Sequence, residues 1–237
     1  MAMDVYVGPL CRYFANDWLN EVAQMMPEKY VRMSPMGPIP REDPRKYHLA
    51  MLGYRKWVTP VFQKAGVTRL EWDERVNAPY FTQQLVWQQR DHVRLVAAYD
   101  EFRDFTPPET LQGQDMNAWF KQDVAWASAH AAGSSSVYAH LLTCEWWLPV
   151  EFPKPTPAPI PNQQIKPFGS VFALRRELEE LAENVWTTPA SELARRPLDE
   201  TLPGETPLRH YAREGWSKLW QLSGDAVKHQ LVMLLDY

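Results

Sequence analysis

The stretch that decides the fold is residues 170–186, SVFALRRELEELAENVW. Its apolar residues recur at intervals of three and four positions, which places them on one face of an α-helix; they are Val171, Leu174, Leu178, Leu181 and Val185. Ser170 stands where an N-cap is expected, because a serine hydroxyl accepts a hydrogen bond from a free amide of the first turn. The stripe is too short for a coiled coil, so we expect this helix to dock on the helices that precede it.

A proline-rich segment, residues 153–168, comes directly before this helix. It holds Pro153, Pro155, Pro157, Pro159, Pro161 and Pro167. Proline lacks an amide hydrogen and has a fixed φ angle, so such a segment disfavours a helix or a central strand and favours an extended chain. We therefore expect a linker here, between an N-terminal helical lobe with a small β element, residues 1–152, and a C-terminal helical module, residues 169–237, packed on that lobe.

Helical periodicity dominates the N-terminal lobe. It predicts helices at about residues 16–26, 44–57, 81–102 and 116–127. Val5 and Val7 alternate with other residues and predict a strand. The apolar run that ends at Phe152 predicts a second strand, which is a candidate partner for the first.

The C-terminal module continues the helical pattern. Thr206-Pro207 predicts a helix start, and Gly224 is expected to separate that helix from a terminal apolar helix ending at Tyr237. Taken together, the pattern predicts a mainly α fold, or α+β with a small β element: a bundle-like single domain with a short two-stranded β piece.

The composition excludes several classes of protein. The chain has 237 residues, of which 45% are hydrophobic and 23% charged, with two cysteines and a net charge of −4. This hydrophobic content argues against disorder, two cysteines cannot make a disulfide framework, and no apolar run is long enough to span a bilayer. The negative charge favours neither nucleic acid nor an anionic membrane as a partner. The opening residues lack the basic and apolar regions of a secretory signal, so we expect a cytoplasmic protein.

The 11 tryptophans raise the question of a stacking surface for sugars or bases. Most of them fall on apolar helical stripes, so we expect Trp57 and Trp119 to anchor the core. Trp146 and Trp147 would point to opposite faces of a strand, and one of the two is a candidate for an exposed, adhesive side chain.

The surplus negative charge is concentrated in one part of the chain. Residues 169–205 hold eight acidic residues and four arginines, an excess of four, which equals the net charge of the whole chain. Because the apolar face of the 170–186 helix is committed to packing, its acidic side is left to face solvent or a basic partner. Within this segment we predict a partner-binding surface made of Glu179, Glu180, Glu183, Asp199 and Glu200.

Two other kinds of site are weaker candidates. No strong catalytic motif is present, but His140 and Cys144 would share a helix face, with Glu145 beside them, and such residues can activate a thiolate or bind zinc. Packed core residues are the commoner explanation of this spacing, so we assign no catalytic residue, no metal ligand and no cofactor. The third alternative is nucleic-acid binding by a local basic cluster, for which a solvated helix face is the commoner explanation: Arg41, Arg45, Lys46, Arg55 and Lys56.

Three short pieces of sequence resemble bacterial immunity-type proteins, which neutralise polymorphic or secreted toxins. They are residues 6–10 (YVGPL) with Arg12-Tyr13, residues 147–149 (WLP) up to Phe152, and Gly169-Ser170 with Glu177-Leu178. The resemblance implies a cytoplasmic, non-catalytic protein that binds a cognate toxin and occludes its active site. It identifies neither the toxin nor the contact residues.

Overall fold

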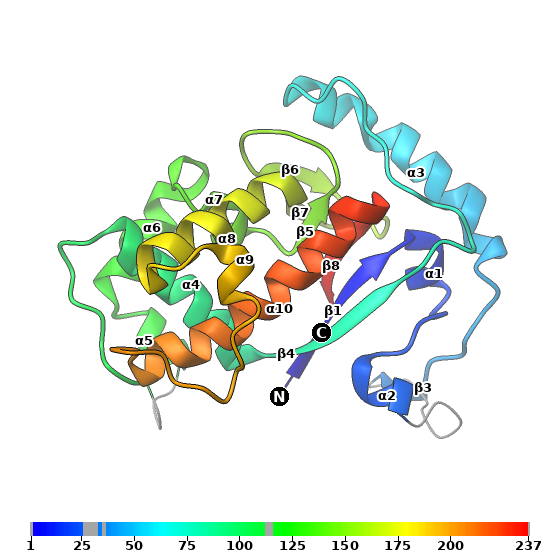
Figure 1. Cartoon of the computed structure of the whole chain (residues 1–237). Coiled ribbons are helices and arrows are strands. Elements are labelled where there is room, and N and C mark those ends of the chain that lie inside the picture. The colour runs from blue at the N-terminus through cyan, green and yellow to red at the C-terminus, as the bar shows by residue number, and fades with distance from the viewer. Residues whose placement is uncertain (1, 26–32, 35–36, 112–115, 237) are drawn as a thin grey trace.

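A six-stranded mixed sheet runs through the centre of the molecule in the order β4-β1-β8-β5-β7-β6 (Figure 1). The computed structural model describes residues 2–25, 33–34, 37–111 and 116–236. The strands of this sheet are β1 (Ala2–Gly8), β4 (Phe81–Val86), β5 (Trp146–Leu148), β6 (Thr156–Pro159), β7 (Ile165–Ser170) and β8 (Val232–Asp236). Neighbouring strands are antiparallel except β5 and β7, which are parallel. The first and last strands therefore pair inside the sheet, with Val5 opposite Leu235.

Helices cover both faces of this sheet, so the molecule has three layers (Figure 1). One face carries α4 (Trp87–Glu101), α8 (Val171–Trp186) and α10 (Pro207–His229). The other face carries α3 (Arg45–Lys64) and the short α1 (Leu10–Phe14). The remaining elements are α2 (Glu21–Met25), the pair β2 (Met33–Ser34) and β3 (Gly37–Pro38), α5 (Met116–Phe120), α6 (Val124–Ala132), the 3-10 turn Gly133–Ser135, α7 (Ala139–Thr143) and α9 (Ala190–Leu193).

Successive residues of the central strands point into different cores. In β5, Trp147 packs in the core formed with α4, α8 and α10, whereas Trp146 and Leu148 pack in the core beneath α3. In β8, Met233 packs in the core formed with α4, α8 and α10, and Leu234 packs in the core beneath α3. Both faces of these strands are therefore buried, which explains why their sequences are almost uniformly apolar instead of alternating.

A glycine allows α4 and α10 to approach closely. A Cβ atom placed on Gly215 of α10 would lie 2.7 Å from the backbone oxygen of Gln89 and 2.9 Å from Cγ2 of Val93. Both distances are well inside van der Waals contact, so only glycine fits here without a shift of the backbone.

Backbone groups at the two edges of the sheet are occupied or absent. In the edge strand β6, Pro157 and Pro159 have no amide hydrogen. In the opposite edge strand β4, the amide of Gln84 donates to Oε2 of Glu21 at 3.3 Å, and its carbonyl accepts from Nζ of Lys218 at 2.7 Å.

The prediction of a helical bundle with a two-stranded β piece was wrong, because the fold is α+β with a six-stranded sheet. The helix expected over residues 81–102 is strand β4 followed by α4, and the expected terminal helix is strand β8. Helix α10 runs through Gly224 without a break. The strand at Val5–Val7 is confirmed, but β5 pairs with β7 and β8 and does not pair with β1.

The three expected parts of the chain contribute to one sheet. Most of the proline-rich residues 153–168 are extended as expected, in the edge strand β6 and in most of β7, with a turn at residues 161–163 between them. Strand β7, which contains Pro167, lies inside the sheet, so the expectation that this segment makes no central strand was wrong. Strand β8, from residues 169–237, lies between β1 and β5, from residues 1–152. Of the helix expected over residues 16–26, the structure shows only α2, Glu21–Met25. Residue 26, the last of the expected helix, lies outside the described residues.

The tryptophans agree with expectation only in part, and Trp119 packs against the core formed with α4, α8 and α10. Trp57 is 57% exposed, so its assignment to the core was wrong. Trp119 is half-buried. Trp146 and Trp147 point to opposite faces of β5 as predicted, but both are buried, because helices cover both faces of the sheet.

Candidate functional site

Helix α8 presents the predicted acidic side chains to solvent. Its N-terminus is capped as predicted, since Oγ of Ser170 accepts a hydrogen bond from the amide of Ala173 at 3.2 Å. The apolar stripe of α8 is buried in the core, including Val171, Leu174, Leu178 and Leu181. Glu179, Glu180 and Glu183 are exposed and form no ion pair within the described part of the chain. Three carboxylates are therefore available to a basic ligand.

Asp199 and Glu200 are exposed in the loop between α9 and α10. A buried arginine holds this loop from below: Nη1 of Arg213 donates to the carbonyl of Pro197 at 3.1 Å, and its Nη2 donates to the carbonyl of Glu200. Arg213 also pairs with Glu205 at 2.8 Å, and each of these two side chains is only 1% exposed. The backbone beneath the two exposed carboxylates is thus fixed by a buried charge pair.

Glu205 also connects the loop to the end of α8. Its Oε1 accepts a hydrogen bond from Nε1 of Trp186, the last residue of α8, at 3.0 Å. Burial raises the pKa of Glu205, but hydrogen bonds from Arg213 and from the amide of Leu202 outweigh burial and hold that pKa below its usual value. The five predicted residues therefore lie on two elements joined at this contact. We call Glu179, Glu180, Glu183, Asp199 and Glu200 the acidic surface.

The acidic C-terminal end of α4 adjoins α8. Oδ2 of Asp100 accepts a hydrogen bond from Nδ2 of Asn184 at 2.9 Å, and the hydroxyl of Tyr138 donates to the same oxygen. Burial raises the pKa of Tyr138, and the negative charges of Asp100 and Glu180 raise it further. Glu180 therefore lies close enough to this end of α4 to act on it electrostatically, and Asp104 in the following turn is exposed.

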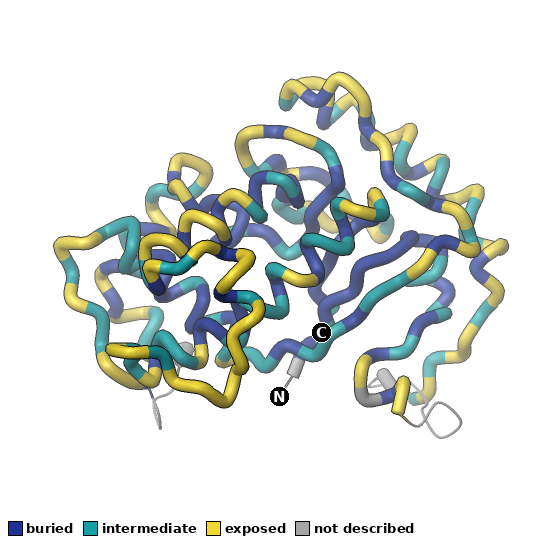
Figure 2. The backbone as a smooth tube through the Cα atoms, in the orientation of Figure 1, coloured by how far each residue is buried: buried dark blue, intermediate teal, exposed yellow. Residues whose placement is uncertain are grey.

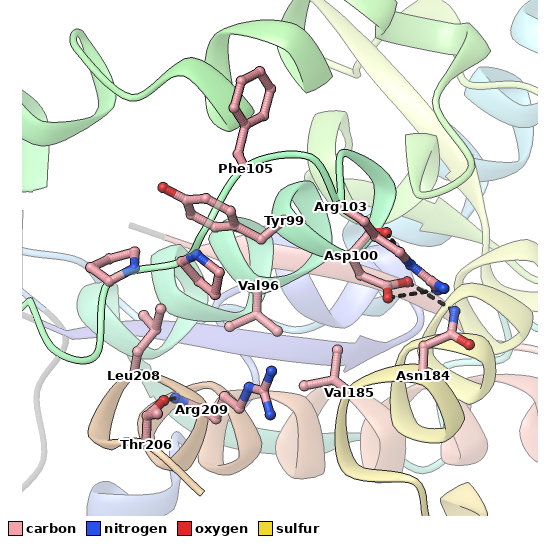
Figure 3. A pocket seen from close by; sticks show the side chains of 12 residues that line it. Val96, Tyr99, Asp100, Arg103, Phe105, Asn184, Val185, Thr206, Leu208 and Arg209 are labelled. Carbon is pink, nitrogen blue, oxygen red and sulfur yellow. Dashed lines mark hydrogen bonds and ion pairs between the residues drawn. The ribbon is translucent and has the colours of Figure 1, made fainter.

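A cavity of about 430 Å³ opens between the end of α4, α8 and the start of α10 (Figure 3). Its apolar wall is formed by Val96, Phe105, Pro107, Pro108, Val185 and Leu208. The guanidinium of Arg209 reaches toward Val96 and Val185, while Arg103, Asp100 and Asn184 meet at one end (Figure 3). Arg103 is paired with Asp100 at 2.9 Å. Because Asn184 and Val185 belong to α8, the cavity borders the helix that carries three residues of the acidic surface.

A second cavity, of about 380 Å³, shares Tyr99 and Phe105 with the first. Asp123 lines it, caps α6 through the amide of Trp126 at 2.7 Å, and accepts hydrogen bonds from the hydroxyl of Tyr99 and from Nε1 of Trp119. The two cavities therefore form neighbouring depressions on either side of Tyr99 and Phe105.

The sequence did not reveal the first cavity, which we call the groove. Carboxylates crowd the end of the 81–102 segment, but no local pattern placed them beside Asn184 and Arg209, which are more than 80 residues away. The groove arises from packing between α4, α8 and α10.

His140, Cys144 and Glu145 form no hydrogen bond or ion pair with one another within the described residues. Nδ1 of His140 lies 2.8 Å from Oε1 of Glu177, and both side chains are buried. Cys144 ends α7 in an extended conformation, and burial raises the pKa of its thiol to about 12. Glu145 pairs instead with Arg90 at 3.3 Å and with Lys166 at 3.0 Å. These three side chains make no nucleophile–base pair, and Cys144 is held as a neutral thiol at neutral pH.

The predicted basic residues lie on or beside α3, on the opposite face of the sheet from α8. Several are already paired: Arg41 with Asp17 at 2.7 Å, Arg45 with Asp43 at 3.0 Å and Lys46 with Glu42 at 3.2 Å. Nη1 of Arg55 donates to the carbonyl of Trp72 at 2.8 Å, and Lys56 is exposed.

Two features are absent from residues 2–25, 33–34, 37–111 and 116–236. No group of three or more His, Cys, Asp or Glu side chains there is arranged to hold a metal ion. None of the helices in these ranges combines the length and the apolar character needed to cross a bilayer.

Comparison with known proteins gives no significant match. No family model, no curated protein and no solved structure matches the chain significantly. The function is therefore inferred from the geometry of the acidic surface and the cavities, and from the short sequence resemblance.

Proposed function

We propose that this chain is a non-enzymatic, protein-binding protein whose binding site combines the acidic surface with the neighbouring groove. Its partner carries a basic surface. The short resemblance to immunity-type proteins supports a secreted bacterial toxin as that partner, with the toxin's active site occluded in the cytoplasm of the protected cell.

The observation that carries the proposal is the position of unpaired, exposed carboxylates beside a cavity that has an apolar wall. Glu179, Glu180 and Glu183 lie on the helix that contributes Val185 to the cavity wall. Charges at the rim of an interface speed association and exclude wrong partners, whereas a side chain buried in a central pocket supplies much of the affinity. A basic segment with one large apolar side chain would satisfy both parts of this site.

The surroundings of the site favour recognition over chemistry. At one end of the cavity Asp100 is engaged with Arg103 and with the amide of Asn184. The buried thiol of Cys144 and the buried pair His140–Glu177 lie outside the residues that line either cavity. The arrangement therefore offers a shaped, charged surface and no activated nucleophile.

The test is a triple charge reversal, Glu179→Lys, Glu180→Lys and Glu183→Lys, measured against candidate secreted toxins, beginning with any that a neighbouring gene encodes. Because the three residues are exposed, each change should alter the free energy of unfolding by less than about 0.5 kcal/mol. The association rate at low salt should fall by about tenfold or more, and its salt dependence should weaken, since electrostatic steering accounts for such factors. Dissociation should change less.

A control is Glu21→Lys, Asp43→Lys and Glu71→Lys, which changes the net charge equally at exposed positions away from α8. These three carboxylates have partners in Gln84, Arg45 and Arg69, so circular dichroism first checks that the control variant is folded. It should slow association only slightly. An equal effect of the two triple variants would show that net charge alone matters and would remove the acidic surface from the site. Failure of the wild-type chain to bind any neighbouring toxin, or to protect cells that express it, would contradict the proposed function.

A further inference from the structure

The outer face of α3 is an exposed surface that the proposed function does not use. The inner face of α3 is committed to the sheet through Met51, Tyr54, Val58 and Phe62, all buried. Additional contacts fix the helix in place: the hydroxyl of Tyr54 donates to the carbonyl of Pro159 at 2.9 Å, and Nδ1 of His48 lies 2.8 Å from the carbonyl oxygen of Glu74. The helix is therefore held rigidly, with one face turned outward along its length (Figure 2).

Two large apolar side chains stand on this outer face. Leu49 is 77% exposed and Trp57 is 57% exposed. They lie eight residues apart, a separation of about 12 Å along a helix axis. Gly53 lies between them on the helix and has no side chain. A Cβ atom placed there would meet nothing within 4 Å, so this position faces open space.

The same face is cationic. Residues 45–64 include five Lys and Arg residues and no Asp or Glu, and two of the five, Arg45 and Lys46, are paired with Asp43 and Glu42. Lys56 and Lys64 are exposed and form no ion pair with any residue of the described ranges. At a helical repeat of 3.6 residues, Lys56 projects in nearly the same direction as Leu49, and Lys64 in nearly the same direction as Trp57. Two unpaired lysines and two exposed apolar side chains thus stand together on the outer face of α3. We call Leu49, Lys56, Trp57 and Lys64 the ridge.

The net charge of −4 hides this local surplus of positive charge. The acidic surface belongs to α8, which packs on the opposite face of the sheet from α3. A negatively charged ligand can therefore approach α3 without meeting the carboxylates of α8.

The combination of groups on the ridge restricts what it can bind. A nucleic-acid backbone would pair with the lysines but offers no apolar environment to Leu49. A second copy of the same face would bring lysines against lysines. The surface of an anionic bilayer supplies both phosphate groups and an apolar interior, and it accepts a convex ridge without needing a complementary groove.

We propose that the outer face of α3 binds the surface of an anionic lipid bilayer. Leu49 and Trp57 enter the interfacial region, where tryptophan is favoured, and Lys56 and Lys64 lie beside the phosphate groups. The acidic surface then faces away from the bilayer and remains open to a protein partner.

The experiment is flotation of the full chain with vesicles of phosphatidylcholine alone or with one quarter phosphatidylglycerol. The chain should float with the anionic vesicles at low salt, float much less at high salt, and stay unbound with phosphatidylcholine alone. Lys56→Gln with Lys64→Gln should lower the partition coefficient by about 30-fold, because each lysine near such a surface contributes about a fivefold factor. Leu49→Ser with Trp57→Ser should lower it as well. Circular dichroism checks that both variants remain folded, as expected for exposed positions.

The matched controls alter exposed residues elsewhere: Lys121→Gln with Arg195→Gln for charge, and Val124→Ser for apolar exposure. They should leave flotation almost unchanged. The proposal is overturned if the wild-type chain does not float with anionic vesicles at low salt, or if the control pair reduces flotation as much as the α3 pair does. It is also overturned if α3 binds soluble polyglutamate but no vesicle, a result that would assign the ridge to an acidic protein.

Discussion

Replacing Arg213 with methionine tests how the loop of the acidic surface is held. Arg213 pairs with Glu205 at 2.8 Å, with both side chains 1% exposed, and also donates to the carbonyl of Pro197. Removing one partner of a buried ion pair costs about 3–5 kcal/mol, because the remaining charge is left without compensation. Glu205 keeps hydrogen bonds from Nε1 of Trp186 and from the amide of Leu202, each at 3.0 Å. We therefore expect a loss near the lower end, about 3 kcal/mol, in the free energy of unfolding.

Urea denaturation measures this loss, and a second variant isolates its cause. In the double variant Glu205→Gln with Arg213→Met no uncompensated charge remains, so at least about 1 kcal/mol of the loss should return. Amide exchange in the loop that carries Asp199 and Glu200 should accelerate in the single variant. The reasoning fails if Arg213→Met costs less than about 1 kcal/mol, or if the double variant is no more stable than the single one.

The same pair predicts a dependence on pH. The folded-state pKa of Glu205 is below its usual value of 4.5, so the ionised carboxylate stabilises the fold above pH 4.5. This contribution is lost as the pH falls through the folded-state pKa, where the carboxylate is protonated. In Arg213→Met burial raises the pKa of Glu205 without Arg213 to oppose it, so the difference in stability between the wild-type chain and this variant should shrink steadily as the pH falls. A difference that grows on acidification would contradict the assignment.

Three further predictions follow from packing. Gly215→Ala should lower the free energy of unfolding by about 1–3 kcal/mol, because the added Cβ atom would overlap α4. Gly53→Ala, on open helix surface, should raise it by about 0.5–1 kcal/mol. Equal effects of the two variants in urea denaturation would refute the close approach of α4 and α10. Burial raises the pKa of the Cys11 and Cys144 thiols to about 12, so a thiol reagent should label the native chain slowly at pH 7 and the unfolded chain rapidly; fast native labelling would revive the enzyme alternative. Limited proteolysis should cut first in the exposed turn at residues 162–164, and the two fragments should stay together on gel filtration because strand pairs cross the cut; fragments that separate without denaturant would indicate two independent domains.

The parts of the fold that follow from local pattern could be predicted from the sequence. Helix α8 is an example: an apolar face at intervals of three and four residues, with a serine at its N-cap, requires no knowledge of the rest of the chain. The exposure of Glu179, Glu180 and Glu183 follows from the same pattern, because they occupy the side opposite the apolar stripe. The helix start at Thr206 is confirmed for the same reason.

The parts that depend on tertiary packing could not be predicted in this way. Residues 231–235, LVMLL, are apolar at every position because β8 is buried on both faces, and such a run does not distinguish a strand from a buried helix. β4 passes directly into α4 at Val86 without a loop, so the two elements read as one long helix. The groove and the support of the loop by Arg213 arise from contacts between distant segments, which leave no periodic signal.

The sheet has consequences for how other chains can approach. A partner often binds by adding a strand to a sheet, and aggregates grow in the same way, through unpaired amides and carbonyls along an edge strand. Here the outer edge of β6 lacks amide hydrogens at Pro157 and Pro159, and the outward amide and carbonyl of Gln84 in β4 are taken by Glu21 and Lys218. Strand addition is therefore disfavoured at both ends of the sheet. A chain that associates with this protein is therefore expected to recognise side chains on its helices and loops, and the two edge strands are poor templates for fibre growth.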